Sequence, residues 1–136
     1  MSKEVRFGDI AVGSEMPALV KMPVDHMQLV RYAGASGDFN PLHTDPEVGK
    51  KVGIGQIAHG MLIMGFVGQA ITDWIPKKCL KKFSVRFAGM TRPGDTVTVT
   101  GKVREKADGN KIVCDVEAKN QKEEVLVTGY FEAVLP

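Results

Sequence analysis

The sequence has few cysteines and little net charge, and each scarcity excludes a class of protein. Its 136 residues include two cysteines, Cys79 and Cys114, which lie far apart and form no C-x-x-C pattern. Isolated cysteines of this kind are typical of free thiols rather than of a disulfide framework. The formal net charge is only +2, and there is no basic arm with interleaved aromatic residues. The composition therefore excludes a typical nucleic-acid-binding protein.

The sequence also lacks the long apolar segments that direct a chain to a membrane. Its first ten residues contain no apolar core of a secretory signal. The longest uncharged run, residues 52–72, begins with Gly53, Gly55, Gln56 and His59. Its apolar part is thus shorter than the roughly 20 residues that a spanning helix needs. We expect a cytoplasmic protein that does not use a membrane as a partner.

What the sequence does contain is enough apolar material for one core. Hydrophobic residues make up 43% of the chain and charged residues 25%, which is ordinary for a globular protein and argues against disorder. Neither a repeat nor a linker interrupts it. At this length we expect one domain over residues 1–136.

The first half of the chain predicts one strand followed by helices. The strand is expected within residues 11–22, and a short helix follows over residues 24–35. Residues 58–74 form the longest helical pattern and carry almost no charge, so we expect this helix to be buried nearly all round.

From Cys79 onward, apolar and polar residues alternate, which predicts four β-strands. Asp108-Gly109-Asn110 indicates a hairpin turn between two of them. The last strand, residues 125–135, is apolar on both faces and should be central or at an interface. The whole pattern predicts an α+β fold in which an antiparallel five-stranded sheet wraps around a long central helix.

The segment of residues 35–46 holds the strongest candidates for chemistry, Asp38 and His43. Its Ser-Gly and Asn-Pro dipeptides favour sharp turns, so we expect neither residue to belong to a regular element. Ala58-His59-Gly60-Met61 then opens the long helix, whose free N–H groups can meet developing negative charge. An acid/base pair followed by a helix N-terminus indicates chemistry on a carbonyl-like substrate.

These residues resemble the hydratase motif of MaoC-type dehydratases, which comprise (R)-specific enoyl-CoA hydratases and (3R)-hydroxyacyl thioester dehydratases. The matching runs are residues 32–46 and 58–62, and the similarity extends to residues 85–87, 92–95 and 127–130. The resemblance implies the hotdog fold and a homodimer. It also implies a hydro-lyase of fatty-acid or polyhydroxyalkanoate metabolism that needs no cofactor. The reaction would be reversible syn hydration of trans-2-enoyl-CoA to (R)-3-hydroxyacyl-CoA.

The resemblance also assigns roles to single residues. Asp38 and His43 would hold one water between them, and Gly60 would offer a backbone N–H to the thioester carbonyl. We interpret His43 as the group that activates the water and Asp38 as the group that handles the α-proton, but which group transfers which proton stays open. The candidates for substrate binding are Asn40, Phe39, His59, Met61 and Arg86.

Each candidate for binding also has a structural interpretation. Asn40 could serve only as a turn former before proline, and Phe39 and Met61 could be plain core residues. For His59 we favour an orienting or core role. Arg86, together with Lys77, Lys78, Lys81 and Lys82, could meet CoA phosphates or an acidic acyl carrier protein, although charged runs are usually solvated faces.

A metal site from His43, His59 and a carboxylate is rejected, because their spacing matches no usual ligand pattern and the chemistry needs no metal. Several other functions stay open. A (3R)-hydroxyacyl-[acyl-carrier-protein] dehydratase would use the same residues. A thioesterase could share the fold. A non-catalytic acyl-thioester binding module is the alternative outside the enzymes.

Overall fold

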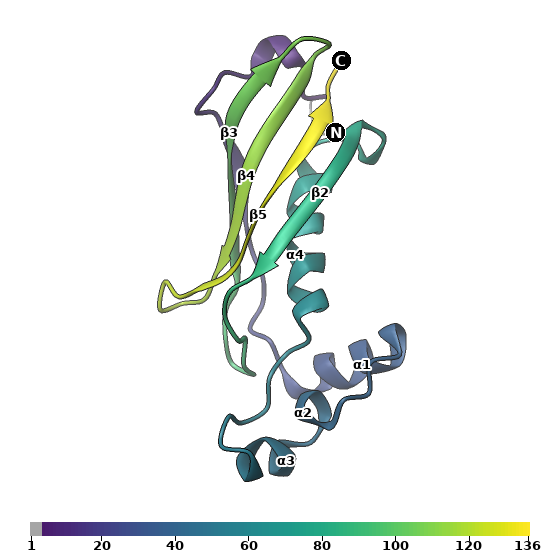
Figure 1. The fold of residues 1–136 in the computed structure, drawn as a ribbon, viewed down its shortest axis with the longest axis vertical. Coiled ribbons are helices and arrows are strands. Elements are labelled where there is room, and N and C mark those ends of the chain that lie inside the picture. Colours follow the sequence, from purple (N-terminus) through teal and green to yellow (C-terminus); the bar gives the residue numbers. More distant parts are fainter. Residues whose placement is uncertain (1–3) are drawn as a thin grey trace.

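The computed structural model describes residues 4–136 and places one antiparallel sheet against a long helix (Figure 1). The strands are β1 (Glu15–Val20), β2 (Leu80–Phe87), β3 (Thr98–Ala107), β4 (Lys111–Lys119) and β5 (Val125–Val134), in the spatial order β1-β3-β4-β5-β2. The helices are α1 (His26–Ser36), α2 (Pro41–Thr44), α3 (Pro46–Lys51) and α4 (Gly60–Trp74), with short 3₁₀ turns at Phe7–Asp9 and Lys77–Cys79. This is the hotdog fold, as the resemblance implied.

Helix α4 lies against one face of the sheet (Figure 1) and supplies the centre of the core. Its buried residues recur in pairs every turn, and they are Leu62, Ile63, Phe66, Val67, Ala70 and Ile71. They face β1, β3, β4 and β5. The opposite side of α4, which includes Met61 and Gly65, is exposed. The expectation of a helix buried nearly all round was therefore wrong for this chain, because one sheet covers only one side of a helix.

The order of the strands decides which of them are available for pairing. Strand β5 lies between β4 and β2 and is hydrogen-bonded on both sides, so it is central, as expected. The free edges of the sheet are β1 and β2. An edge-to-edge dimer cannot use the final strand, since its backbone N–H and C=O groups are already paired.

Two further expectations about the strands and thiols were confirmed. Asp108-Gly109-Asn110 joins β3 to β4, and the positive φ angles of Gly109 (79°) and Asn110 (58°) are those that a tight hairpin turn requires. Cys79 and Cys114 are free and buried, and burial raises the pKa of the Cys114 thiol to about 12. Both side chains serve as small core residues.

Helices α1, α2 and α3 lie beyond the N-terminal end of α4 (Figure 1), and each begins at a side-chain cap. Asp25, Asn40 and Asp45 accept hydrogen bonds from the backbone N–H two or three residues onward. Asn40 and Pro41 thus start a helix as well as a turn, and His43 lies within the single turn of α2. The expectation that His43 belongs to no regular element was wrong, whereas Asp38 does lie in a connection.

None of the helices in the described part of the chain is long and apolar enough to cross a membrane.

Candidate active site

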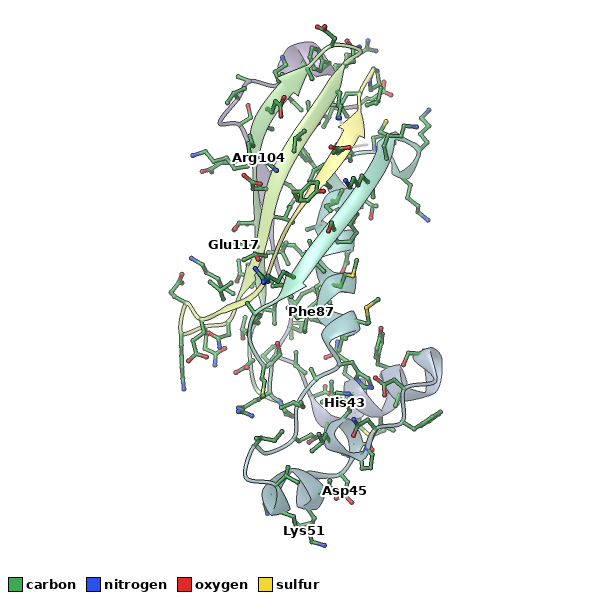
Figure 2. All side chains as sticks on the ribbon, viewed as in Figure 1. His43, Asp45, Lys51, Phe87, Arg104 and Glu117 are labelled. Carbon is green, nitrogen blue, oxygen red and sulfur yellow. The ribbon has the colours of Figure 1, made fainter. Side chains whose placement is uncertain are left out.

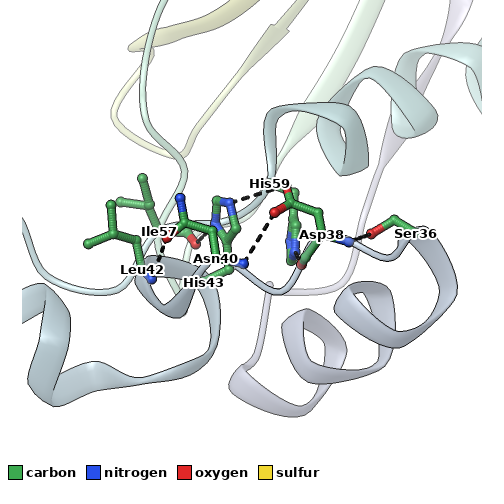
Figure 3. A network of polar contacts seen from close by, with 7 residues as sticks. All are labelled: Ser36, Asp38, Asn40, Leu42, His43, Ile57 and His59. Atoms are coloured by element: carbon green, nitrogen blue, oxygen red, sulfur yellow. Dashed lines mark hydrogen bonds and ion pairs between the residues drawn. The ribbon is translucent and has the colours of Figure 1, made fainter.

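Asp38 and His43 approach each other beside the N-terminus of α4 (Figure 3). Asp38 follows Gly37, which ends α1 with a left-handed φ of 77° and so turns the chain back toward α2. The Oδ2 atom of Asp38 lies 3.6 Å from Nε2 of His43. The carboxylate side chain is 53% exposed and the imidazole 11% exposed, so the pair joins a solvated acid to a nearly buried base.

The hydrogen bond on the far side of the His43 ring fixes its tautomer. Nδ1 lies 2.8 Å from the carbonyl oxygen of Ile57, and a carbonyl can only accept, so Nδ1 carries the hydrogen. In the neutral ring Nε2 then keeps a free lone pair, and this atom faces Asp38. The fold thus points the basic nitrogen of His43 into the candidate site.

The residues before α4 form a backbone cradle around His43. Gln56 Nε2 donates hydrogen bonds to the His43 carbonyl at 2.7 Å and to His26 Nδ1 at 2.8 Å. The Ile57 N–H donates to the carbonyl of Leu42 at 3.1 Å. Sequence reasoning missed Gln56 and Ile57. Ile57 acts through its main chain, which leaves no signal in the identity of a side chain.

A second segment far along the chain braces this cradle from behind. The Ala58 N–H donates to the carbonyl of Thr91 at 2.7 Å, and Arg92 Nη1 donates to the carbonyl of Ile54. Asp95 in turn accepts from the Arg92 N–H at 2.9 Å and closes the turn of residues 92–95. The position of the catalytic candidates therefore depends on a loop that follows β2.

Gly60 is the first residue of α4, and the free N–H groups of a helix begin there. A Cβ at this position would lie 3.1 Å from Cε1 of Phe87, at the end of β2. Figure 2 shows Phe87 above His43, near the start of α4. The glycine thus permits both close packing by Phe87 and close approach to a backbone donor. The dipole of α4 favours negative charge at the same place.

His59 is buried directly behind the pair. The residue is 1% exposed, its ring stacks on that of His43, and its Nε2 lies 3.1 Å from the carbonyl oxygen of Asp38. Burial lowers the pKa of His59 below its usual 6.5, and a charge on His43 would lower it further, while the bond to the Asp38 carbonyl opposes the shift. His59 was predicted as a candidate for substrate binding, with an orienting or core role favoured, and its role stays a prediction.

Asn40 contacts the pair through its main chain. Its N–H donates to Oδ1 of Asp38 at 3.2 Å, while its side-chain oxygen accepts from the Leu42 N–H at 3.0 Å. It therefore helps to orient the carboxylate and caps α2 at the same time. Phe39 and Met61 are 66% and 57% exposed, so in this chain they are not plain core residues. Their part in binding substrate stays a prediction.

Arg86 does not join the pair within one chain. Neighbouring residues of a strand point to opposite faces, and Phe87 points toward Gly60, so Arg86 lies on the outer face of the sheet. Lys77 and Lys78 flank the opposite end of α4, about 20 Å from Gly60 at 1.5 Å per residue.

A hollow of about 650 Å³ over β1, β3 and β4 contains none of the candidate residues.

Asp38, His43 and His59 can each place one ligand atom within 4.8 Å of the others, which makes a metal site worth testing against the geometry. The two imidazole rings are stacked, with centroids 3.9 Å apart and planes 24° apart. The lone pairs of stacked rings run side by side rather than converging on one ion. One nitrogen of each ring also faces a backbone carbonyl. This geometry favours the interpretation without a metal.

Residues 9–125 match the family model described as the MaoC like domain. Among curated proteins, the chain is 32% identical over 125 residues to enoyl-CoA hydratase ChsH3 of Mycobacterium tuberculosis, which covers 89% of this chain and 42% of that protein. It is 30% identical over 110 residues to the mitochondrial 3-hydroxyacyl-[acyl-carrier-protein] dehydratase of Arabidopsis thaliana, with 77% and 66% covered.

Among solved structures, the unliganded R-hydratase PhaJ1 of Pseudomonas aeruginosa superposes with a TM-score of 0.88 at 26% identity, over 98% of this chain and 86% of that chain. The chain spans less than half the length of the first four curated relatives that it matches, between 6% and 42%.

Proposed function

We infer the function from the family to which this chain belongs, that of the MaoC-like domains. On this premise the chain is an (R)-specific enoyl-CoA hydratase, a hydro-lyase that adds water reversibly to trans-2-enoyl-CoA and forms (R)-3-hydroxyacyl-CoA. The observation that carries the proposal is the pairing of Asp38 Oδ2 with His43 Nε2 beside the N-terminus of α4. Similarity to an enoyl-CoA hydratase and an R-hydratase supports the substrate class.

The first step of the proposed reaction is activation of a water by His43. The free lone pair on Nε2 can take a proton from a water that also hydrogen-bonds to Asp38, since a 3.6 Å separation leaves room for one water to contact both atoms. The oxygen of this water then bonds to the β-carbon of the enoyl group. Imidazole suits the task because its ordinary pKa of about 6.5 lies near neutral pH.

The second requirement is charge stabilisation and return of a proton. As the C–O bond forms, negative charge moves through the α-carbon to the thioester oxygen, which the Gly60 N–H and the dipole of α4 stabilise. The proton that His43 took from the water is then returned to the α-carbon, by way of Asp38 in our interpretation, and both side chains regain their starting forms. Hydroxyl and hydrogen come from groups on the same side of the substrate, so the addition is syn.

We also propose that the working form is a homodimer. The exposed side of α4 carries Met61, and the exposed rings of Phe39 and Phe87 lie near its N-terminal end. These apolar groups surround a site that one chain leaves open. The free edge β2 ends at Phe87, so a second copy that pairs there would cover them. Gel filtration that shows a monomer at working concentration would contradict this part of the proposal.

A second candidate is dehydration of a (3R)-hydroxyacyl group on an acyl carrier protein. The similarity to the mitochondrial dehydratase favours it, since 77% of this chain aligns with that protein. Asp38, His43 and Gly60 would play the same roles, because the two reactions are the forward and reverse directions of one chemistry. Only the carrier differs, and the carrier binds outside the pair.

The test follows the loss of ultraviolet absorbance of a short trans-2-enoyl-CoA, with chiral identification of the product. His43→Asn retains a donor near Nδ1 for the Ile57 carbonyl but removes Nε2. Asp38→Asn retains the shape of the side chain but removes its charge. Each should reduce kcat by about 10² to 10⁴ fold, the usual contribution of general acid–base groups. Asp45→Asn is the matched control, since asparagine can still cap α3 there.

Turnover by the wild type with an (R)-product, lost in both variants and retained in the control, would support the hydratase. Turnover of the acyl-carrier-protein thioester alone would support the second candidate. Binding of acyl-CoA without turnover of either substrate would replace the enzyme with a binding module. Hydrolysis of the thioester bond would indicate a thioesterase.

A further inference from the structure

We propose that His59 is a positioning residue, which holds the imidazole of His43 and the main chain of Asp38 in the geometry that the reaction needs. This inference rests on the proposed function. It goes beyond the catalytic pair because His59 contacts both members of the pair and lies beneath them rather than in the open site. The whole His59 residue is 1% exposed, whereas the side chain of Asp38 is 53% exposed.

The first contact is a stack of two imidazole rings. The ring centroids of His43 and His59 lie 3.9 Å apart, with 24° between the planes. On another side, Tyr32 of α1 meets His59 edge-on at 4.7 Å and 68°. His59 is therefore wedged between α1 and the catalytic ring. A side chain packed in this way limits the rotation of the His43 ring about its bond to Cβ.

The second contact is a hydrogen bond to the chain that carries the carboxylate. Nε2 of His59 donates to the carbonyl oxygen of Asp38 at 3.1 Å. The Asp38 carboxylate itself accepts from the Asn40 N–H, so its orientation depends on where the backbone of residues 38–40 lies. His59, which lies 21 residues after Asp38 in the chain, holds that backbone from the buried side.

These contacts leave His59 with one defined chemical form. Because Nε2 carries the hydrogen, Nδ1 keeps a lone pair, and this buried atom has no hydrogen-bond partner within the described residues 4–136. A proton on Nδ1 would make His59 a buried cation, with its ring centroid 3.9 Å from that of His43. The protonated Nδ1 would itself have no partner to offset the charge. His59 therefore stays neutral when His43 becomes an imidazolium, and its ring face lies against that cation.

A residue that acts in this way changes turnover more than binding. The Asp38 carboxylate and the His43 ring meet the reacting water, whereas His59 meets only the two residues behind it. A shift of about 1 Å in reacting groups can cost on the order of 10² in rate. We expect loss of His59 to lower kcat while KM stays near its wild-type value.

Two substitutions separate the two contacts. His59→Phe retains a ring for stacking but removes the donor and leaves the Asp38 carbonyl unpaired. His59→Gln places an amide N–H near the position of Nε2 and removes the ring. We expect His59→Phe to lose about 10- to 100-fold in kcat with KM changed less than about twofold, and His59→Gln to recover part of that loss. Thermal unfolding identifies any variant that has simply lost its fold.

Loss of kcat in His59→Phe with partial rescue in His59→Gln would support the proposal. It would be overturned if His59→Phe turned over like the wild type, if its defect appeared only in KM, or if glutamine rescued nothing.

Imidazole ¹⁵N NMR of the free protein tests the same inference without activity. His59 should remain an Nε2–H tautomer as the pH falls through about 6.5, where an ordinary histidine titrates. In His59→Phe the amide signals of residues 38–40 should shift. A His59 that titrates near 6.5, or unchanged amides in the variant, would overturn the proposal even if the wild type proved inactive on every thioester and the proposed function failed.

Discussion

His43 Nε2 and Asp38 Oδ2 lie 3.6 Å apart, which is beyond direct hydrogen-bond distance but short enough for one water to bond to both. Each side chain is held by a different part of the backbone. The Ile57 carbonyl holds the ring, and the Asn40 N–H holds the carboxylate. The gap is thus set by the main chain of two segments rather than by the attraction of the two groups for each other.

The amide of Gln56 is a testable part of the cradle. Gln56→Glu retains the shape but replaces a donor with a carboxylate that faces the carbonyl oxygen of His43. We expect a free energy of unfolding lower by about 1 to 3 kcal/mol, the usual cost of an unpaired polar group, together with reduced kcat. Urea unfolding and the absorbance assay measure the two effects. Lys50→Gln, on exposed α3, is the control, and a Gln56→Glu variant as stable as the control would contradict the prediction.

The pKa of His59 predicts how stability depends on pH. Its folded-state pKa lies below the unfolded value of about 6.5, so below that pH the unfolded chain binds a proton that the folded chain does not. The contribution of His59 to the free energy of unfolding is fully present above about pH 6.5. It declines as the pH falls toward the folded pKa, by at most about 1.4 kcal/mol per pH unit. His59→Phe should flatten this decline. Equal slopes in urea unfolding of the two proteins between about pH 7 and about pH 5.5 would show that His59 is not the cause.

At Gly129, strand β5 leaves no room for a side chain against β2. A Cβ there would collide with the carbonyl oxygen of Ser84 and lie 2.9 Å from Cα of Val85. Because these are backbone atoms of a paired strand, Gly129→Ala should destabilise the fold by about 1 to 3 kcal/mol or more. Gly34→Ala is the matched control, since a Cβ on the exposed side of α1 meets nothing within 4 Å and should stabilise by about 0.5 to 1 kcal/mol. Denaturant midpoints that move in the same direction would be inconsistent with this steric account.

Removal of metals should leave the proposed hydratase activity unchanged. Asp38, His43 and His59 are close enough to suggest a site, but their stacked rings do not converge on one ion. Dialysis against a strong chelator, followed by the absorbance assay, measures the effect. Activity that disappears with the chelator and returns with zinc would show that these residues hold a metal, with ligands of the usual nitrogen and oxygen type.

Much of the fold and part of the site could be predicted from the sequence, because they depend on local patterns. The period-two alternation after Cys79, the Asp108-Gly109-Asn110 turn and the apolar run that became α4 each identify an element without reference to the rest of the chain. Asp38 and His43 lie only five residues apart, so one turn-rich segment brings them together. As local structure, Asn40-Pro41 was interpreted as a turn, although the same pair also caps and starts α2.

The sequence by itself thus determined the strands, the long helix and the candidate pair of Asp38 and His43. The tertiary structure alone decided the tautomer of His43, through the carbonyl of Ile57, and the place of His59 beneath the pair. It also decided that β2 rather than β5 forms a free edge and that Arg86 faces away from Gly60. Backbone acceptors, ring stacking and strand order join residues far apart in the chain. These relationships arise from packing in three dimensions, which no local pattern of side chains records.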